Sequence, residues 1–158
     1  IAGMSITDER KEVFDFSQPY FDSGVVMAVK TDSDVKGYED LNGQKVAVKT
    51  GTEGFTFAES IASEYGFEMV VFDDSSAMYQ DVIAGNSVAC FEDYPVVGYA
   101  ISQGLDLTMP TDKEQGSSYG FAVKKGENSE LLKMFDEGLQ NLKDSGEYQN
   151  ILDTYIKE

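Results

Sequence analysis

The sequence is 158 residues long and carries twelve Lys and Arg against twenty-nine Asp and Glu, a formal net charge of −17 at pH 7. A surface this acidic repels phosphate backbones, so nucleic acid is excluded as the expected partner. The chain has no histidine and one cysteine, Cys90, which excludes common zinc sites, Ser-His-Asp or Cys-His catalysis and an internal disulfide. Cys90 lies in the apolar stretch SVACF, where we expect a buried small hydrophobic residue.

Strand and helix patterns alternate through the middle of the chain. Short apolar or alternating segments predict strands at residues 25–29, 45–49, 69–72, 88–91, 105–109 and 119–123. Between them we expect a helix that ends at Gly66, a second capped by Ser75 or Ser76, and a third that follows Asp93 and stops at Gly104. Residues 44–109 therefore read β-α-β-α-β-α-β, which predicts a mostly parallel sheet covered by helices.

The two ends of the chain have a different pattern. Residues 1–4 read as a strand without a local partner. After residue 123, two apolar helical stripes follow, at 131–142 and 148–156. Because these helices have no further strand to cover within the chain, we expect both ends to belong to one incomplete lobe.

Two stretches place anion-binding groups beside turns. In GMSITDER, Arg10 follows the good helix N-cap Thr7, and its guanidinium can hold a carboxylate through two hydrogen bonds. Pairing with a neighbouring acid is the more common role of such an arginine. In VAVKTGTEGF, a strand runs into a glycine-bracketed turn, so the N–H groups of Thr52 and Glu53 would point outward from the next helix. An ordinary strand-to-helix turn gives the same pattern.

A third stretch, CFEDYPV, brings two acids to the end of a buried strand. Asp93 can cap the helix that follows, which is its more common role, or bind an ammonium group. Neighbouring strand residues point to opposite faces, so we do not expect Glu92 and Asp93 to act as one acid–base pair. Together, the three stretches offer a cation, N–H donors and an acid, which is the complement that an α-amino acid requires.

The segments AGMSITDERKEVFDFSQPYFDSG, AVKTGTEG and FEDYP resemble bacterial extracellular solute-binding proteins of the polar amino-acid uptake family, and most of all glutamine-binding proteins of ABC transporters. The resemblance covers essentially the whole chain. It implies an α/β fold of the type II periplasmic-binding-protein class, with two lobes joined by two crossing strands. Residues 1–24 would be part of lobe one with the first crossing at 20–24. Residues 25–115 would form all of lobe two. Residues 116–158 would hold the second crossing at 116–120 and the end of lobe one, which makes the chain an N-terminally truncated member.

The resemblance also implies roles for matching residues. Arg10 would hold the ligand α-carboxylate together with the N–H groups of Thr52 and Glu53, and Asp93 would take the α-ammonium group. Lobe-one positions would accept further hydrogen bonds from the ammonium group and shape the pocket. The expected ligand-binding set is Gly3, Ser5, Arg10, Lys49, Thr52, Glu53, Glu92 and Asp93.

Lys49 bears on the choice of ligand. It matches a lysine that contacts the side-chain amide oxygen in glutamine binders, and a fixed cation there would repel lysine, arginine or ornithine. Glutamine is therefore the leading ligand and glutamate the next. A register shift of one residue would instead point Lys49 to solvent. Glu92 stands where the matching glutamine binder has histidine, and an acid there would accept from an amide and oppose glutamate.

The expected function is capture of a polar amino acid for the membrane permease subunits of an ABC uptake transporter, outside the cell or in the periplasm. We expect neither catalysis nor a metal or cofactor. Two alternatives stay open: a sensory ligand-binding domain of a receptor, and a dehydratase-like enzyme on the same fold, with Glu92 or Lys49 as acid or base. The incomplete lobe predicts a dimer or strand swap that covers its exposed edges.

Overall fold

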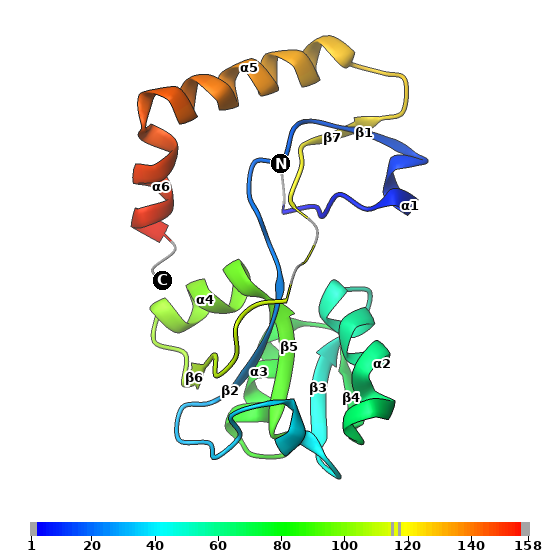
Figure 1. The fold of residues 1–158 in the computed structure, drawn as a ribbon, viewed down its shortest axis with the longest axis vertical. Helices are drawn as coiled ribbons and strands as arrows, with labels where there is room; N and C mark the ends of the chain where they lie inside the picture. Colours follow the sequence, from blue (N-terminus) through cyan, green and yellow to red (C-terminus); the bar gives the residue numbers. More distant parts are fainter. Residues whose placement is uncertain (1–2, 115, 117, 156–158) are drawn as a thin grey trace. The chain divides into compact units, whose positions relative to one another are not determined.

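The computed structural model describes residues 3–114, 116 and 118–155. It divides into two compact units (Figure 1). The central unit is Val25–Gln115, and the terminal unit combines Ile1–Gly24 with Gly116–Glu158. Half of the strand predicted at residues 1–4 lies outside the described residues, and the other half, Gly3 and Met4, is not in a strand.

The central unit is built on a five-stranded sheet in the order β4-β3-β5-β2-β6. Its strands are β2 (Val25–Lys30), β3 (Lys45–Lys49), β4 (Glu68–Phe72), β5 (Ala89–Asp93) and β6 (Leu107–Thr108). Strand β3 pairs in parallel with β4 and β5, but β2 pairs antiparallel with both β5 and β6. Four of the five strands, β3, β4, β5 and β6, therefore run in one direction, which confirms the predicted mostly parallel sheet, and β2 is the reversed strand. Strands β5 and β6 run in the same direction, as their connection through a helix requires, but β2 enters between them in the opposite direction.

Helices cover both faces of this sheet (Figure 1). They are the 3-10 helix η1 (Tyr38–Leu41), α2 (Glu53–Tyr65), α3 (Ser75–Ile83) and α4 (Tyr94–Ser102). Strand β2 contributes side chains to both faces of the sheet, because alternate residues pack in different clusters. Val25, Met27 and Val29 pack in the cluster that includes Ala58 of α2. The intervening Val26 and Ala28 pack in the cluster with α3 and α4. A strand covered on both faces is apolar at consecutive positions, as β2 is.

Local signals set the ends of these helices. Helix α2 ends at Gly66, which adopts a left-handed φ of 69°, as predicted. Helix α4 begins at Tyr94 and Pro95, also as predicted. The predicted cap of α3 is wrong, because the side chain of Asp74, rather than Ser75 or Ser76, accepts from Ala77 N–H. Ser75 instead turns toward the sheet, where it contacts two charged residues.

Cys90 is fully buried in the cluster beneath α3 and α4, which confirms its prediction as a small core residue. Burial raises the pKa of its thiol, and the nearby charge of Glu92 raises it further. The thiol is therefore protonated at neutral pH and shielded from solvent.

The terminal unit contains two segments that pair through a short sheet. Its elements are α1 (Asp8–Lys11), β1 (Phe14–Phe16), β7 (Ala122–Lys124), α5 (Ser129–Ser145) and α6 (Glu147–Tyr155). Strands β1 and β7 are antiparallel. The predicted strand at 119–123 begins later in the structure, at Ala122, and Tyr119 forms isolated bridges to Ser5 and Phe21. The ring of Phe135 on α5 packs against Tyr20 and Phe121.

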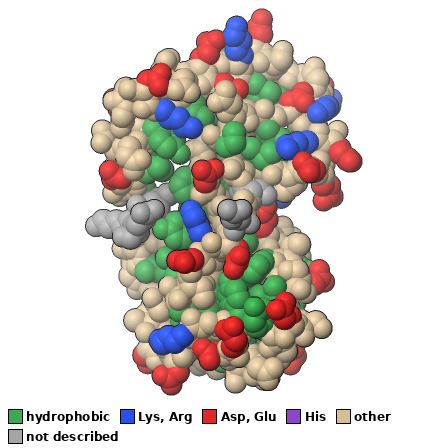
Figure 2. All heavy atoms as spheres, viewed as in Figure 1, with side chains coloured by type: hydrophobic (Ala, Val, Ile, Leu, Met, Phe, Trp, Pro, Cys, Tyr) green, Lys and Arg blue, Asp and Glu red, His purple; other side chains and the backbone are tan. Residues whose placement is uncertain are grey.

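The surface carries both charge and exposed apolar groups. Figure 2 shows acidic side chains dispersed over the visible face rather than gathered in one patch. Large apolar side chains are exposed in the terminal unit at Val13, Leu131, Met134, Leu142, Ile151 and Tyr155. Within the described residues, no helix combines the length and apolar character needed to cross a membrane.

Tyr38 gives the central unit a predicted stability loss at high pH. Its hydroxyl donates to Glu114 Oε1 at 2.9 Å. Burial, followed by this hydrogen bond, raises the pKa of Tyr38 from 10.0 to about 12. Because the folded pKa is the higher one, folding favours the protonated phenol, and this contribution is complete below pH 10.0 and lost toward about pH 12. Tyr38→Phe should therefore flatten the fall in unfolding free energy across that range, measured by urea unfolding.

The matched control is Tyr155→Phe, because Tyr155 is an exposed tyrosine of the terminal unit. Its pH profile should follow that of the unsubstituted chain. Equal slopes for Tyr38→Phe and the unsubstituted chain would show that ionisation of Tyr38 does not oppose folding.

Candidate functional site

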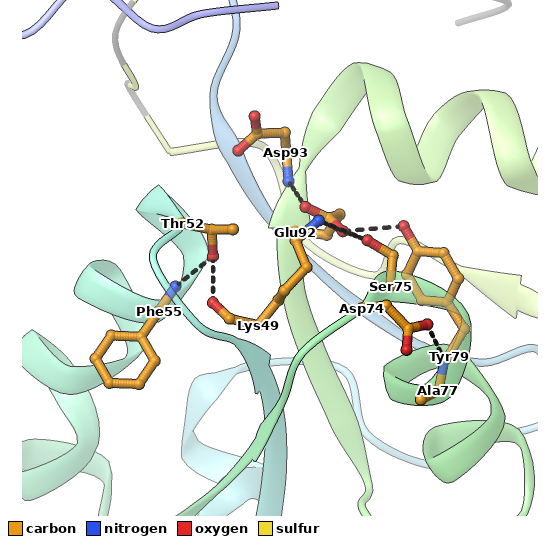
Figure 3. Close-up of polar contacts among 9 residues, drawn as sticks. All are labelled: Lys49, Thr52, Phe55, Asp74, Ser75, Ala77, Tyr79, Glu92 and Asp93. Carbon is orange, nitrogen blue, oxygen red and sulfur yellow. Dashed lines mark hydrogen bonds and ion pairs between the residues drawn. The ribbon is translucent and has the colours of Figure 1, made fainter.

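Five of the eight predicted site residues lie at one edge of the central sheet. Because β3 and β5 are parallel, their carboxyl ends meet at the same edge. Lys49 ends β3, and Glu92 and Asp93 end β5. Thr52 and Glu53 stand where α2 begins. We call this group the β3–β5 edge (Figure 3).

The turn from β3 into α2 is fixed by its own hydrogen bonds. The Thr52 hydroxyl accepts from Phe55 N–H at 3.2 Å and donates to the Lys49 carbonyl at 2.8 Å. Gly51 takes a left-handed φ of 72°, which glycine adopts without strain. The N–H groups in the first turn of a helix have no acceptor inside that helix. This turn therefore presents the start of α2 to the sheet edge.

Gly54 allows α2 to approach β5 closely. A Cβ atom at this position would lie 2.6 Å from the backbone oxygen of Phe91. Beyond a glycine in the turn, no sequence signal predicted this contact, because the contact depends on how the helix packs against a distant strand. Gly54 therefore sets the position of the helix start.

A buried hydrogen-bonded cluster joins Lys49 to Glu92 (Figure 3). The Glu92 side chain is 3% exposed and Lys49 is 24% exposed, and Lys49 Nζ lies 3.4 Å from Glu92 Oε2. Lys49 also donates to the Ser75 hydroxyl at 2.6 Å, and Ser75 donates to Glu92 Oε2 at 2.7 Å. The Tyr79 hydroxyl donates to the same oxygen at 3.2 Å. Lys49 is therefore held by the chain, and the alternative in which it points to solvent does not apply.

The environment of Tyr79 keeps it a hydrogen-bond donor. Burial, followed by the negative charge of Glu92, raises the pKa of its hydroxyl far above the usual range. The other Glu92 oxygen, Oε1, accepts from the N–H of Asp93 at 3.1 Å. Both carboxylate oxygens of Glu92 are thus occupied by donors from the chain itself.

Sequence reasoning missed Ser75 and Tyr79 as members of this cluster. Ala47 pairs with Cys90, so the strand alternation brings Lys49 and Glu92 to the same face two residues later. That face is covered by α3, where Ser75 and Tyr79 stand four residues apart on one side of the helix. The i, i+4 pair of hydroxyl residues was the available signal, but its target depends on the register of β3 against β5.

Asp93 is directed away from the Glu92 cluster in Figure 3. It occupies the N-cap position of α4, but its side chain makes no capping hydrogen bond to the described first turn. The more common role of such an acid, helix capping, therefore does not explain this side chain. Glu92 contacts α3 through Ser75 and Tyr79, consistent with the expectation that the two acids do not form one pair.

The remaining predicted residues, Gly3, Ser5 and Arg10, lie in the terminal unit. The Gly3 N–H donates to the Tyr20 hydroxyl at 3.0 Å. Arg10 Nη1 donates to the carbonyl of the buried Ser5 at 2.9 Å, which ties the guanidinium to that segment. None of the ion pairs formed within residues 3–114, 116 and 118–155 includes Arg10. Pairing with a neighbouring acid is therefore not the role of Arg10 in the described structure.

In the described part of the chain, no three Asp, Glu or Cys side chains gather as metal ligands would. The polar groups of the β3–β5 edge are instead suited to a small charged molecule, since they combine an acid, a held lysine and the start of a helix.

The family model of bacterial extracellular solute-binding proteins, family 3, matches residues 1–158. The chain belongs to this family. Among curated members, it is 31% identical to the ABC transporter glutamine-binding protein GlnH of Bacillus subtilis, over 100% of the chain and 57% of the relative. Other curated relatives are named for arginine or cystine. The chain spans 57–60% of the length of three curated relatives, which are named for histidine, arginine and glutamine.

Two solved structures are similar to this chain. A second substrate binding domain from Streptococcus pneumoniae is 46% identical, with a TM-score of 0.83 over 99% of this chain and 71% of that one. Substrate binding domain 2 of Lactococcus lactis GlnP is 42% identical, with a TM-score of 0.80 over 99% of this chain and 68% of that one. These matches confirm the predicted family and the type II periplasmic-binding-protein fold class, with one complete lobe and part of another.

Proposed function

We propose that the chain captures a polar amino acid as the substrate-binding part of an ABC uptake system. It would act outside the cell or in the periplasm and deliver the ligand to membrane permease subunits. The observation that carries this proposal is that an acid, Asp93, and the start of α2 meet at the same edge of the sheet. An acid and a helix start together complement an ammonium group and a carboxylate.

Each end of the amino acid has a proposed partner. Asp93 takes the α-ammonium group, while the N–H groups of Thr52 and Glu53 take the α-carboxylate with Arg10. Arg10 is suited to this because Ser5 holds one of its nitrogens and a guanidinium retains further donors. Gly3 and Ser5 would shape the ammonium end. Micromolar affinity needs about 8 kcal/mol, which a few charge-assisted hydrogen bonds in a closed site supply.

The lobes of the family have proposed counterparts here. The central unit, residues 25–115, would be lobe two, while residues 1–24 and 116–158 would contribute to lobe one. The crossings would fall near residues 20–24 and 116–120. The division of the chain at the same points supports this assignment.

Glutamine is the proposed ligand. The Lys49 ammonium is fixed by Ser75 and Glu92, and such a cation suits the oxygen of a side-chain amide. The name of the relative GlnH supports the same choice. An arginine or lysine side chain would face an immobile positive charge.

The dehydratase alternative finds less support at this edge. An acid or base must reach the proton that it transfers. Glu92 is 2% exposed and accepts hydrogen bonds from Ser75, Tyr79 and Asp93. These contacts favour a structural role for Glu92 in the binding site over a role as the acid or base that exchanges a proton with a substrate.

Calorimetric titration tests the proposal. Glutamine, glutamate, asparagine, arginine and cystine would be titrated in turn into the protein as its gene encodes it. We expect saturable binding of glutamine, weaker binding of glutamate and none of arginine. Saturable binding of arginine without glutamine would overturn the ligand, and no response to any amino acid would overturn the function.

A further inference from the structure

The charge of Lys49 is balanced within the chain. Its ammonium group lies 3.4 Å from the Glu92 carboxylate, and that carboxylate is almost completely buried. Opposite charges this close and this poorly hydrated attract strongly. A ligand that reaches Lys49 therefore meets a paired cation rather than an isolated one.

Ser75 bridges Lys49 and Glu92 through two hydrogen bonds that are both shorter than the direct ion pair. Its hydroxyl accepts from Lys49 at 2.6 Å and donates to Glu92 at 2.7 Å, whereas the direct ion pair is longer. Tyr79 adds a donor to the same carboxylate oxygen from the next turn of α3. The two α3 hydroxyls thus fix the carboxylate to which Lys49 is bound.

The Lys49 ammonium group keeps one N–H donor for a ligand. A lysine carries three N–H donors, and Ser75 and Glu92 engage two of those of Lys49. The third can serve a ligand. Because the pair is neutral overall, this donor favours an uncharged acceptor such as an amide oxygen.

We propose that Ser75 and Tyr79 are positioning residues for ligand selectivity, which hold Glu92 against Lys49 so that this end of the site presents one N–H donor without net charge. This inference rests on the proposed function and deepens it. A carboxylate side chain would meet the fixed Glu92 charge behind Lys49, and a cationic side chain would meet Lys49 itself. The ligand class selected is an amino acid with a neutral amide end.

The test compares selectivity in Ser75→Ala with that of the unsubstituted protein. Loss of the bridging hydroxyl should free Lys49 from Glu92 and reduce the preference for glutamine over glutamate by about tenfold. Tyr79→Phe should reduce it in the same direction. Binding of norvaline, which has the α-groups but no amide, should not change, because its side chain has no acceptor for Lys49.

Two matched variants separate positioning from a general effect on folding. Ser76→Ala makes the same change at an exposed neighbour in the same turn and should leave the preference unchanged. Ser75→Thr keeps a hydroxyl and should restore the preference. A Ser75→Ala protein that melts normally and keeps its full glutamine preference would overturn the inference and leave the proposed function intact.

A ligand-free measurement tests the geometry itself. The held ammonium group of Lys49 should give a slowly exchanging signal in ¹H–¹⁵N spectra, assigned by its loss in Lys49→Met. This signal should disappear in Ser75→Ala and persist in Ser76→Ala. Its persistence in Ser75→Ala would overturn the positioning role even if the protein bound no amino acid, a result that would separately overturn the proposed function.

Discussion

Asp93→Asn is expected to weaken glutamine binding by about 100-fold, close to 3 kcal/mol. The substitution keeps the shape of the side chain but removes the charge that we assign to the ligand's α-ammonium group. An ammonium group buried without its charged partner loses much of its compensation for lost hydration. Calorimetric titration of the variant measures the loss directly.

Stability separates this effect from damage to the fold. A loss of affinity in a variant that keeps the urea midpoint of the parent would assign the loss to the ligand contact rather than to the fold. Asp73→Asn, the same change at an exposed acid of the central unit, should leave affinity unchanged. Affinity of Asp93→Asn within a few-fold of the parent would show that Asp93 does not hold the ammonium group.

Gly54→Ala should destabilise the central unit by about 2–3 kcal/mol, because the added methyl group overpacks the helix against the strand. The new Cβ would lie 2.6 Å from the Phe91 backbone oxygen and 2.9 Å from its carbonyl carbon. Neither backbone atom can move aside as a side-chain tip can, so the start of α2 has to shift. We expect weaker ligand binding as well, since the same helix start carries Thr52 and Glu53.

The matched control is Gly138→Ala on α5. A Cβ there meets no atom within 4 Å, so the change should stabilise the helix by about 0.5–1 kcal/mol through its greater helix propensity. Urea unfolding of both variants tests the difference in sign. Equal stabilisation by both substitutions would mean that α2 tolerates the methyl group and that Gly54 does not set its position.

The order of helices and strands in the central unit was predictable because its signals are local. The αL glycine at Gly66 and the proline at Pro95 act within one turn of the chain, and the structure places helix ends there. The direction of β2 was not predictable in this way. Its partners β5 and β6 lie far along the chain, so the pairing is decided by packing on both faces rather than by nearby residues.

The candidate site also combines features that local sequence predicts with features that depend on packing. The presence of Lys49 and Asp93 at strand ends follows from where two apolar runs stop, and sequence alone located both. The contacts of Ser75 and Tyr79 with Glu92 require that β3, β5 and α3 meet in one register. The close approach of Gly54 to Phe91 requires the same precision. Such contacts depend on how several elements pack together, so the sequence of one segment does not predict them.

Amide chemical-shift mapping of a glutamine titration tests the central claim most directly. In ¹⁵N-labelled protein, we predict saturable changes that are largest at Thr52, Glu53 and Asp93 on the β3–β5 edge. A saturable response confined to other parts of the chain, such as the hollow lined by Phe14, Phe16 and other residues of the terminal unit, would contradict the assignment of the site.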